Sequence, residues 1–262
     1  MSSSILPSVN AMFRKVDRMK LSYTEIFKYS DILNPVSPTA LFSAGKLAQL
    51  EPKKLVLDLG SGKGFPSLSW ASIFGVRVEG FDINEKYVEY ATSCAKMLNL
   101  SHRVKYSCQD IRELKFNRKY DVVASLGLGI AQVYGSNGDA LRVFKTMLHK
   151  NGVLVLAEPV WLAKPVSSKV LKALGEAEDS FLTKPKMQEL LRESGFQELG
   201  NFVSSKEDWE IYIRPIYIAM QGIIESKSKL AEEAQRVING FRAEYDAVGQ
   251  HWNMVLWVAR SR

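Results

Sequence analysis

The pattern of apolar and polar positions predicts a strand, a tight turn and a helix near the first quarter of the chain. Residues 55–59 form a short apolar run, which ends at Gly60, Gly62 and Gly64, and the amphipathic segment 65–74 follows at once. That order is typical of a buried strand leading into a helix. Glycine takes positive φ and lets a ligand approach the backbone closely, so a ligand is expected at the carboxyl end of this strand.

Further apolar runs predict more strands of the same sheet. Residues 76–81 and 104–108 form the next two predicted strands, and residues 120–127 comprise a fourth strand with its loop. Residues 152–158 form the fifth. Short apolar strands that alternate with helical segments are typical of an α/β domain with a parallel sheet. Ligands bind such sheets at the carboxyl ends of the strands.

The C-terminal part of the chain predicts two more strands and a helical connection. Residues 196–203 form the sixth predicted strand and residues 252–259 the seventh. The intervening residues 204–250 carry apolar positions at helical spacing, namely Leu230, Ala234, Val237, Phe241 and Val248. We therefore expect an inserted helical element between the last two strands.

The N-terminal region is also predicted to be helical. Its apolar residues recur at helical spacing, at Val9, Met12, Phe13, Val16 and Met19. This spacing predicts one or two helices over residues 8–33. Asn34-Pro35 ends the region, because the residue before a proline avoids the helical conformation. Ser37-Pro38 then marks the start of the next helix, with proline at its first position.

Three kinds of ligand site use a glycine-rich turn after a strand. A P-loop needs Lys followed by Ser or Thr, but Gly64 follows Lys63 here. A dinucleotide-binding turn needs a third glycine where Phe65 stands, so that match is weak. The remaining pattern is Gly-x-Gly-x-Gly with an acid two residues before it, here Asp58. It resembles the first motif of class I S-adenosylmethionine (SAM) methyltransferases.

Acids downstream strengthen this resemblance. Asp82 closes the second predicted strand, about 20 residues past the turn, where a carboxylate can hold both ribose hydroxyls of a nucleoside. The resemblance places Asp110 near the adenine amino group and Ile111 against the adenine ring. In all, it implies cofactor contacts from Asp58, Gly60, Ser61, Gly62, Gly64, Asp82, Ile83, Asp110, Ile111 and Ser125.

The resemblance also implies an architecture. It predicts a doubly wound, seven-stranded, mostly parallel sheet of the Rossmann-like methyltransferase fold, with an antiparallel last strand and a helical cap. We divide the chain into an N-terminal helical lid, residues 1–36, and a SAM-dependent methyltransferase domain, residues 37–262, with the helical insertion at about 204–250. Small-molecule methyltransferases often use the N-terminal segment as a lid. Static packing on the sheet is the alternative, and the sequence leaves both open.

Charge, apolar runs and cysteine content indicate which partners and which cellular compartment to expect. Lys and Arg number 35 against 28 Asp and Glu, for a net charge of +7, but no basic run occurs, which argues against nucleic acid as a partner. No apolar run is long enough to cross a bilayer, and the N-terminus has no secretory pattern. We therefore expect a cytoplasmic protein with no membrane partner, in which Cys94 and Cys108 are buried free thiols.

The loop after the fourth predicted strand narrows the substrate. Superfamily members that methylate exocyclic amines of nucleic-acid bases, or glutamine, often carry Asn/Asp-Pro-Pro-Tyr/Phe there, whereas this chain has Ser125-Leu-Gly-Leu-Gly129. The acidic cluster of the magnesium-dependent catechol-type relatives is missing too. His102, His149 and His251 are isolated from one another, so we expect no metal site.

The chemistry itself demands few side chains. Proximity and orientation lower much of the barrier to in-line methyl transfer, and a general base helps where the acceptor must lose a proton. Glu158 and Tyr134 lie near strand ends and are the candidates for that role. Aromatic candidates for the substrate pocket are Phe27, Trp161, Trp209 and Tyr212.

Three short segments carry a narrower resemblance. Ala157-Glu-Pro-Val-Trp161, Asn34-Pro-Val-Ser37 and Asp208-Trp209 resemble a little-characterised group of bacterial and archaeal small-molecule methyltransferases. We therefore expect an enzyme that transfers the methyl group of SAM to a small molecule by in-line displacement. An RNA methyltransferase and a SAM-binding protein without turnover are the alternatives. The sequence leaves open the oligomeric state and whether the acceptor atom is oxygen, nitrogen, sulfur or carbon.

Overall fold

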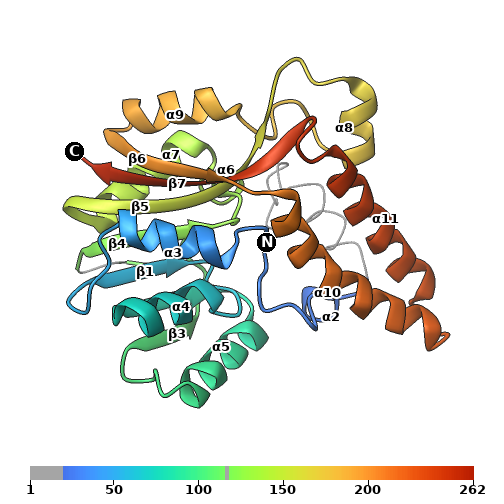
Figure 1. Cartoon of the computed structure of the whole chain (residues 1–262), viewed down its shortest axis with the longest axis horizontal. Coiled ribbons are helices and arrows are strands. Elements are labelled where there is room, and N and C mark those ends of the chain that lie inside the picture. Colours follow the sequence, from blue (N-terminus) through green and yellow to red (C-terminus); the bar gives the residue numbers. More distant parts are fainter. Residues whose placement is uncertain (1–19, 116–117) are drawn as a thin grey trace, which may run out of the picture.

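A sheet of seven strands forms the centre of the molecule (Figure 1). The computed structural model describes residues 20–115 and 118–262. The strands are β1 (Leu55–Leu59), β2 (Arg77–Asp82), β3 (Val104–Cys108), β4 (Tyr120–Leu126), β5 (Leu148–Trp161), β6 (Phe196–Val203) and β7 (Trp252–Ser261). Their order in the sheet is β3-β2-β1-β4-β5-β7-β6, and β7 alone of these strands runs antiparallel to β5. This confirms the predicted doubly wound, mostly parallel sheet with an antiparallel last strand.

The strands follow the predicted apolar runs, with one clear difference in length. β1, β3 and β6 begin and end as predicted. β5 is longer than the predicted 152–158, because both of its ends find partners. Leu148 pairs with Tyr120 of β4, and Trp161 pairs with Trp252 of β7.

Helices cover both faces of the sheet (Figure 1). One face carries α3 (Pro38–Leu47), α4 (Phe65–Phe74) and α5 (Glu85–Met97). The other carries α6 (Ile130–Tyr134), α7 (Asn137–Met147) and α9 (Lys184–Glu193). Successive side chains of β1 point to opposite faces of the sheet. Val56 packs with the helices of the first face, and Leu57 and Leu59 pack with those of the second.

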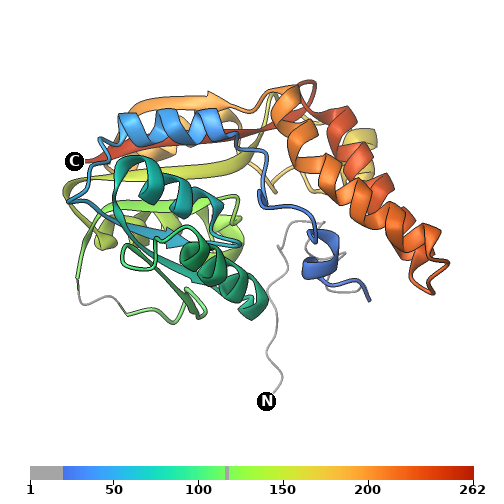
Figure 2. The ribbon, with the colours of Figure 1, turned by 60° about the horizontal axis from the view of Figure 1, so that its bottom comes forward.

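Two long helices fill the connection between β6 and β7. α10 spans Lys206–Glu225 and α11 spans Ala231–Ala247. They lie side by side beyond the carboxyl ends of the parallel strands (Figures 1 and 2). α2 (Tyr23–Ile26) packs against α10, and α8 (Ser168–Leu174) packs against α11. These four helices form a cap that faces the strand ends.

The described part of the N-terminal region is mostly not helical. The prediction of helix over residues 8–19 lies outside the described residues. Over residues 20–33 the helical prediction is wrong in extent, since α2 has four residues. Ser22 and Glu25 form a capping box that begins it. The chain then leaves the helix, and the carbonyls of Phe27 and Ser30 accept hydrogen bonds from Lys63 instead of completing further turns.

The two cysteines differ from expectation in their exposure. Cys94 in α5 is half-buried and Cys108 is exposed, and both are free thiols. The prediction of two buried thiols is therefore wrong, since Cys108 is the last residue of β3, an edge strand. Within the described ranges, the structure has no helix long and apolar enough to cross a membrane.

Candidate functional site

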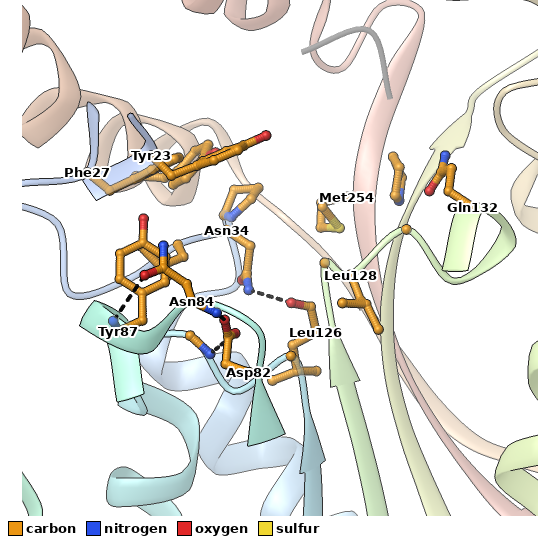
Figure 3. Close-up of a pocket in the computed structure, with 18 of the residues that line it drawn as sticks. Tyr23, Phe27, Asn34, Asp82, Asn84, Tyr87, Leu126, Leu128, Gln132 and Met254 are labelled. Atoms are coloured by element: carbon orange, nitrogen blue, oxygen red, sulfur yellow. Dashed lines mark hydrogen bonds between the residues drawn. The ribbon is translucent and has the colours of Figure 1, made fainter. Parts of the chain in front are cut away.

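A cavity of about 350 Å³ lies between the strand ends and the helical cap (Figure 3). Its strand side comes from the turns after β1 and β2 and the loop after β4, and includes Gly60, Asp82 and Leu128. Its cap side comes from α2, α10, α11 and β7, and includes Phe27 and Tyr212. Open α/β sheets bind ligands at this edge, so the cavity is the candidate site.

The turn after β1 places bare backbone on the strand side. Gly60, Gly62 and Gly64 have φ of 72°, 52° and 81°, in the left-handed region that glycine adopts without strain. A Cβ on Gly60 would lie 2.7 Å from Cδ1 of Leu128, and one on Gly62 would lie 2.7 Å from Cδ1 of Leu33. Gly60 and Gly62 line the cavity, whereas Gly64 serves as the residue before α4. A side chain at Gly60 or Gly62 would therefore collide with a neighbouring leucine as well as strain the backbone.

Asp82 ends β2 and faces the cavity (Figure 3). Its Oδ2 accepts a hydrogen bond from the Gly62 amide at 2.7 Å, and its Oδ1 accepts one from the Asn84 amide at 2.8 Å. Burial raises the pKa of this carboxyl, and the backbone hydrogen bonds oppose that shift. Each carboxylate oxygen keeps a second lone pair, so Asp82 can accept two further hydrogen bonds from a ligand.

Asp58 supports the turn from within the sheet. Its carboxylate is buried and contacts the Ser67 hydroxyl of α4, and burial raises its pKa to about 6. Asp58 and Ser61 line a second, small cavity of about 40 Å³ beneath residues 31–36. The Ser61 hydroxyl is buried there and has no hydrogen-bond partner within the described part of the chain.

Lys63 ties the glycine turn to the N-terminal segment. Its buried ammonium donates hydrogen bonds to the carbonyls of Phe27 at 2.8 Å and Ser30 at 2.7 Å. It also lies 4.8 Å from the ring centroid of Tyr90, whose hydroxyl donates to Asp31 of the same segment. Burial lowers the pKa of Lys63. In the sequence, Lys63 followed by Gly64 excludes a P-loop, and no local pattern there indicates that Lys63 holds the N-terminal segment.

Aromatic rings form most of the cap side. The ring of Phe27, the residue after α2, lies 6.1 Å from that of Tyr212, and Tyr212 lies 5.9 Å from Trp209, which is also in α10. The ring of Trp252, in β7, lies 5.1 Å from Trp209, and that of Tyr23 lies 6.2 Å from Phe27. All five line the cavity. The fold thus brings the predicted pocket residues Phe27, Trp209 and Tyr212 together. The five rings come from segments far apart in the sequence, namely α2 and the residue after it, α10 and β7.

Comparison with known families bears directly on this site. A family model described as a methyltransferase domain matches residues 50–210, which include the glycine turn, Asp82 and the loop after β4. The chain belongs to this methyltransferase family. Membership confirms the predicted class of enzyme, a class I SAM-dependent methyltransferase, and SAM as its cofactor.

Several relatives of this methyltransferase cover most of its length. The uncharacterised protein YjhP of Escherichia coli (strain K12) is 25% identical over 235 residues, which span 87% of this chain and 94% of YjhP. A crystal structure of YjhP has a TM-score of 0.82, covering 91% of this chain and 98% of that one at 23% identity. A SAM-dependent methyltransferase from Geobacter sulfurreducens, solved in complex with S-adenosyl-L-homocysteine, has a TM-score of 0.83 at 22% identity, over 92% and 97% of the two chains.

A relative with a named activity matches a smaller share of the chain. The 27-O-demethylrifamycin SV methyltransferase of Amycolatopsis mediterranei is 26% identical over 189 residues, which span 69% of this chain and 67% of the relative.

Glu158 of the methyltransferase lies behind the cavity wall. Its Oε1 accepts hydrogen bonds from the amides of Gly129 at 3.0 Å and Ile130 at 3.2 Å. Burial raises its pKa to about 8, against the effect of those two donors. Successive side chains of β5 point to opposite faces, so Pro159 lines the cavity and Glu158 does not. Glu158 therefore positions the loop after β4, and its predicted role as a base stays a prediction.

Other predicted residues also lie away from the cavity lining. Tyr134 packs against Phe144 with ring centroids 5.4 Å apart, and Trp161 donates its indole N–H to the Glu178 carbonyl at 2.9 Å. The hydroxyl of Ser125 is buried in the sheet. Neither Tyr134 nor Trp161 lines the cavity, and their predicted roles in proton transfer and substrate contact stay predictions.

The loop after β3 holds the two residues predicted to contact adenine. Asp110 pairs with Arg112, with Nε 3.0 Å from both carboxylate oxygens, and this partner lowers the pKa of Asp110. Ile111 is buried in the core cluster next to α7. Neither lines the cavity, whereas Ile83 does and is 70% exposed. The adenine contacts of Asp110 and Ile111 therefore stay predictions.

Sequence reasoning missed several residues of the lining. Asn34 donates from Nδ2 to the Leu126 carbonyl at 3.0 Å, which fixes the N-terminal segment at the end of β4 (Figure 3). Tyr87 from α5 and Met254 from β7 also line the cavity. The Asn34-Pro35 break was visible in the sequence, but no local pattern indicates that Tyr87 or Met254 meets residues so distant along the chain.

Proposed function

We propose that this methyltransferase transfers the methyl group of SAM to a small-molecule acceptor held on the cap side of the cavity. One observation carries the proposal. A single continuous space joins Gly60, Gly62 and Asp82 to the aromatic rings of the cap. A cofactor on the strand side and an acceptor on the cap side would thus meet in the same cavity.

The strand side suits SAM on its own geometry. Gly60 and Gly62 line the cavity and carry no side chain, so a ligand can lie against their backbone. Asp82 has lone pairs free for two ribose hydroxyls, in charge-assisted hydrogen bonds. Ile83, exposed at the cavity, offers apolar surface to the adenine ring. When bound, SAM supplies a methyl group made electrophilic by its positively charged sulfur.

The chain's own contribution is orientation and exclusion of water. Phe27, Trp209 and Tyr212 are buried and give the acceptor a rigid apolar surface, which limits its poses. Holding two reactants in line lowers a barrier by roughly 7–11 kcal/mol in favourable cases. A catalytic side chain is therefore not required for an acceptor that already has a free lone pair.

The two alternative functions find less support. An RNA methyltransferase needs cationic side chains along its substrate path, and none of the described residues that line the cavity is Lys, Arg or His. A SAM-binding protein without turnover would have no use for an open acceptor space beside the glycine turn. The cavity of about 350 Å³ falls within the usual range of small-molecule sites.

Turnover with labelled cofactor tests the proposal. Protein is incubated with SAM that carries a deuterated methyl group and with fractionated metabolite extracts, and products are followed by mass spectrometry. We expect a labelled small molecule from wild type and from Asp139→Ala, whose carboxylate is exposed, and none from Asp82→Ala.

Calorimetry on the same samples separates the outcomes. Binding of S-adenosylhomocysteine without any labelled product would support the SAM-binding protein without turnover. Binding of NAD in its place would contradict the cofactor assignment.

A further inference from the structure

The charge of the cavity lining is one-sided. Of the described residues that line it, Asp82 and Glu244 are the ones with charged side chains, and both are acids. Asp82 lies on the strand side, which the proposed function assigns to the ribose of the cofactor. Glu244 belongs to α11 and lies on the cap side. An acceptor in this cavity therefore meets a carboxylate without a basic lining residue in the described part of the chain.

We propose that the methyl acceptor is an organic amine, which binds on the cap side as its ammonium form among aromatic rings and Glu244. This rests on the proposed function, because it names the class of acceptor for the same cavity. Glu244 also makes contacts within the protein, and it contributes a negatively charged group to the cap side of the cavity.

The aromatic surface favours a cation over a neutral group. Ring faces carry negative electrostatic potential, and they attract a desolvated ammonium more strongly than they attract a neutral group. Tyr23, Phe27, Tyr212, Trp209 and Trp252 form a continuous series of ring contacts around the cap side. In Figure 3 the rings of Tyr23 and Phe27 lie on one side of the cavity and Tyr87 reaches toward them from the other.

A buried hydroxyl points to the same ligand. Tyr87 is 7% exposed and lines the cavity, and its hydroxyl has no hydrogen-bond partner among the described residues. A buried hydroxyl without a partner is unfavourable, and a ligand N–H that donates to it would remove that cost. Tyr23 and Tyr212, which line the same cavity, also carry hydroxyl groups.

The same arrangement disfavours other acceptors. An anionic acceptor, such as a carboxylate or a phosphate, would lose its hydration against Glu244 without a lining cation among the described residues. A neutral alcohol could pair with Tyr87 but would lack the attraction between an ammonium and a carboxylate. Methyl transfer needs the lone pair of the amine, so one N–H bond must break with its electrons left on nitrogen. The proton passes to bulk water, and the neutral amine then attacks the methyl carbon with its freed lone pair.

Three probes with a shared frame test the assignment. Phenethylamine, 2-phenylethanol and phenylacetate carry charges of about +1, 0 and −1 near pH 7, as expected from their functional groups. Each is titrated by calorimetry into the protein, with and without saturating S-adenosylhomocysteine. We expect the amine to bind at least about tenfold more tightly than the alcohol, and phenylacetate to show no binding.

Two variants locate the effect. Glu244→Gln should weaken phenethylamine binding by about tenfold and leave 2-phenylethanol unchanged, because it removes the charge and keeps the shape. Tyr87→Phe, which removes one hydroxyl, should also weaken the amine and leave S-adenosylhomocysteine affinity intact. Glu232→Gln, an exposed acid on the same helix, is the matched control and should bind all three probes as wild type does.

Each result bears on the proposal. Equal affinity for amine and alcohol, tighter binding of phenylacetate, or no amine binding at millimolar concentration would overturn it. An unchanged amine affinity in folded Glu244→Gln and Tyr87→Phe proteins would overturn it as well. S-adenosylhomocysteine binding is read in the same titrations. Its loss would contradict the proposed function, whereas its presence without amine preference would contradict the amine assignment alone.

Discussion

Replacing Glu158 with glutamine should remove a strong pH dependence from the stability of the fold. This carboxyl is buried behind the loop after β4, and burial raises its pKa from 4.5 to about 8 in the folded state. Such a difference between folded and unfolded states corresponds to about 5 kcal/mol when the group is fully ionised. The glutamine side chain would keep an oxygen for the amides of Gly129 and Ile130 but would carry no proton to release.

The sign follows from where the proton is bound. Below about pH 4.5 both states hold it, and Glu158 adds no pH dependence. Between about pH 4.5 and 8 the folded state holds the proton and the unfolded state does not, so stability falls as pH rises. Above about pH 8 both states are ionised and the full loss remains. Between pH 5 and 8, the free energy of unfolding of wild type should therefore drop by roughly 3 to 4 kcal/mol relative to Glu158→Gln.

Urea denaturation at a series of pH values measures this difference directly. Glu113→Gln, at an exposed position, is the control and should track wild type at every pH. The difference between wild type and Glu158→Gln is the informative quantity, since all other titrating groups are common to both. A difference that stays constant from pH 5 to 8 would refute the reasoning. It would mean that the two amide donors hold Glu158 ionised despite its burial.

Three further predictions concern ligand binding and the N-terminal segment. Asp82→Ala should cost on the order of 2–4 kcal/mol of S-adenosylhomocysteine affinity by calorimetry. It should also lower thermal stability, because the carboxylate holds the amides of Gly62 and Asn84; unchanged affinity would show that it only braces those turns. Lys63→Met should speed hydrogen exchange in residues 21–36, because it removes the donor to the carbonyls of Phe27 and Ser30. Lys28→Met, at an exposed position, is the control and should leave exchange unchanged; equal exchange rates in the two variants would show that Lys63 does not hold this segment. S-adenosylhomocysteine should slow exchange in the described N-terminal segment and in residues 205–250 more than in the sheet, and protection confined to the strand-end turns would identify the cap as static packing.

Much of the fold could be predicted because its elements follow local rules. The run from Leu55 through the glycines to α4 requires a strand, a left-handed turn and a helix start in any context. Helical spacing likewise marked residues 204–250, which contain α10 and α11. The N-terminal prediction failed between residues 20 and 33 for the opposite reason. There the backbone carbonyls bind Lys63, which lies about thirty positions away in the sequence.

The candidate site was predictable on its strand side and much less so on its cap side. Gly60, Gly62 and Asp82 are set by motif and strand end, and all three line the cavity. Glu158 shows where such reasoning stops, because a one-residue step along β5 sends a side chain to the other face. Glu244 lies on the wall only because α11 runs back along α10 beyond the strand ends, which spacing along the chain does not reveal.

The place at which the helical pair joins the sheet has a consequence for how new specificities arise. Val203 at the end of β6 pairs with Val255 of β7, and the Ser204 amide donates to the Met254 carbonyl at 3.0 Å. The two ends of the insertion are thus held together by the sheet itself. Changing the length of such a closed excursion costs little, since loop-closure entropy grows only slowly with length. We therefore expect the length of the helical pair to vary more readily among relatives than the turns that hold Gly60 and Asp82.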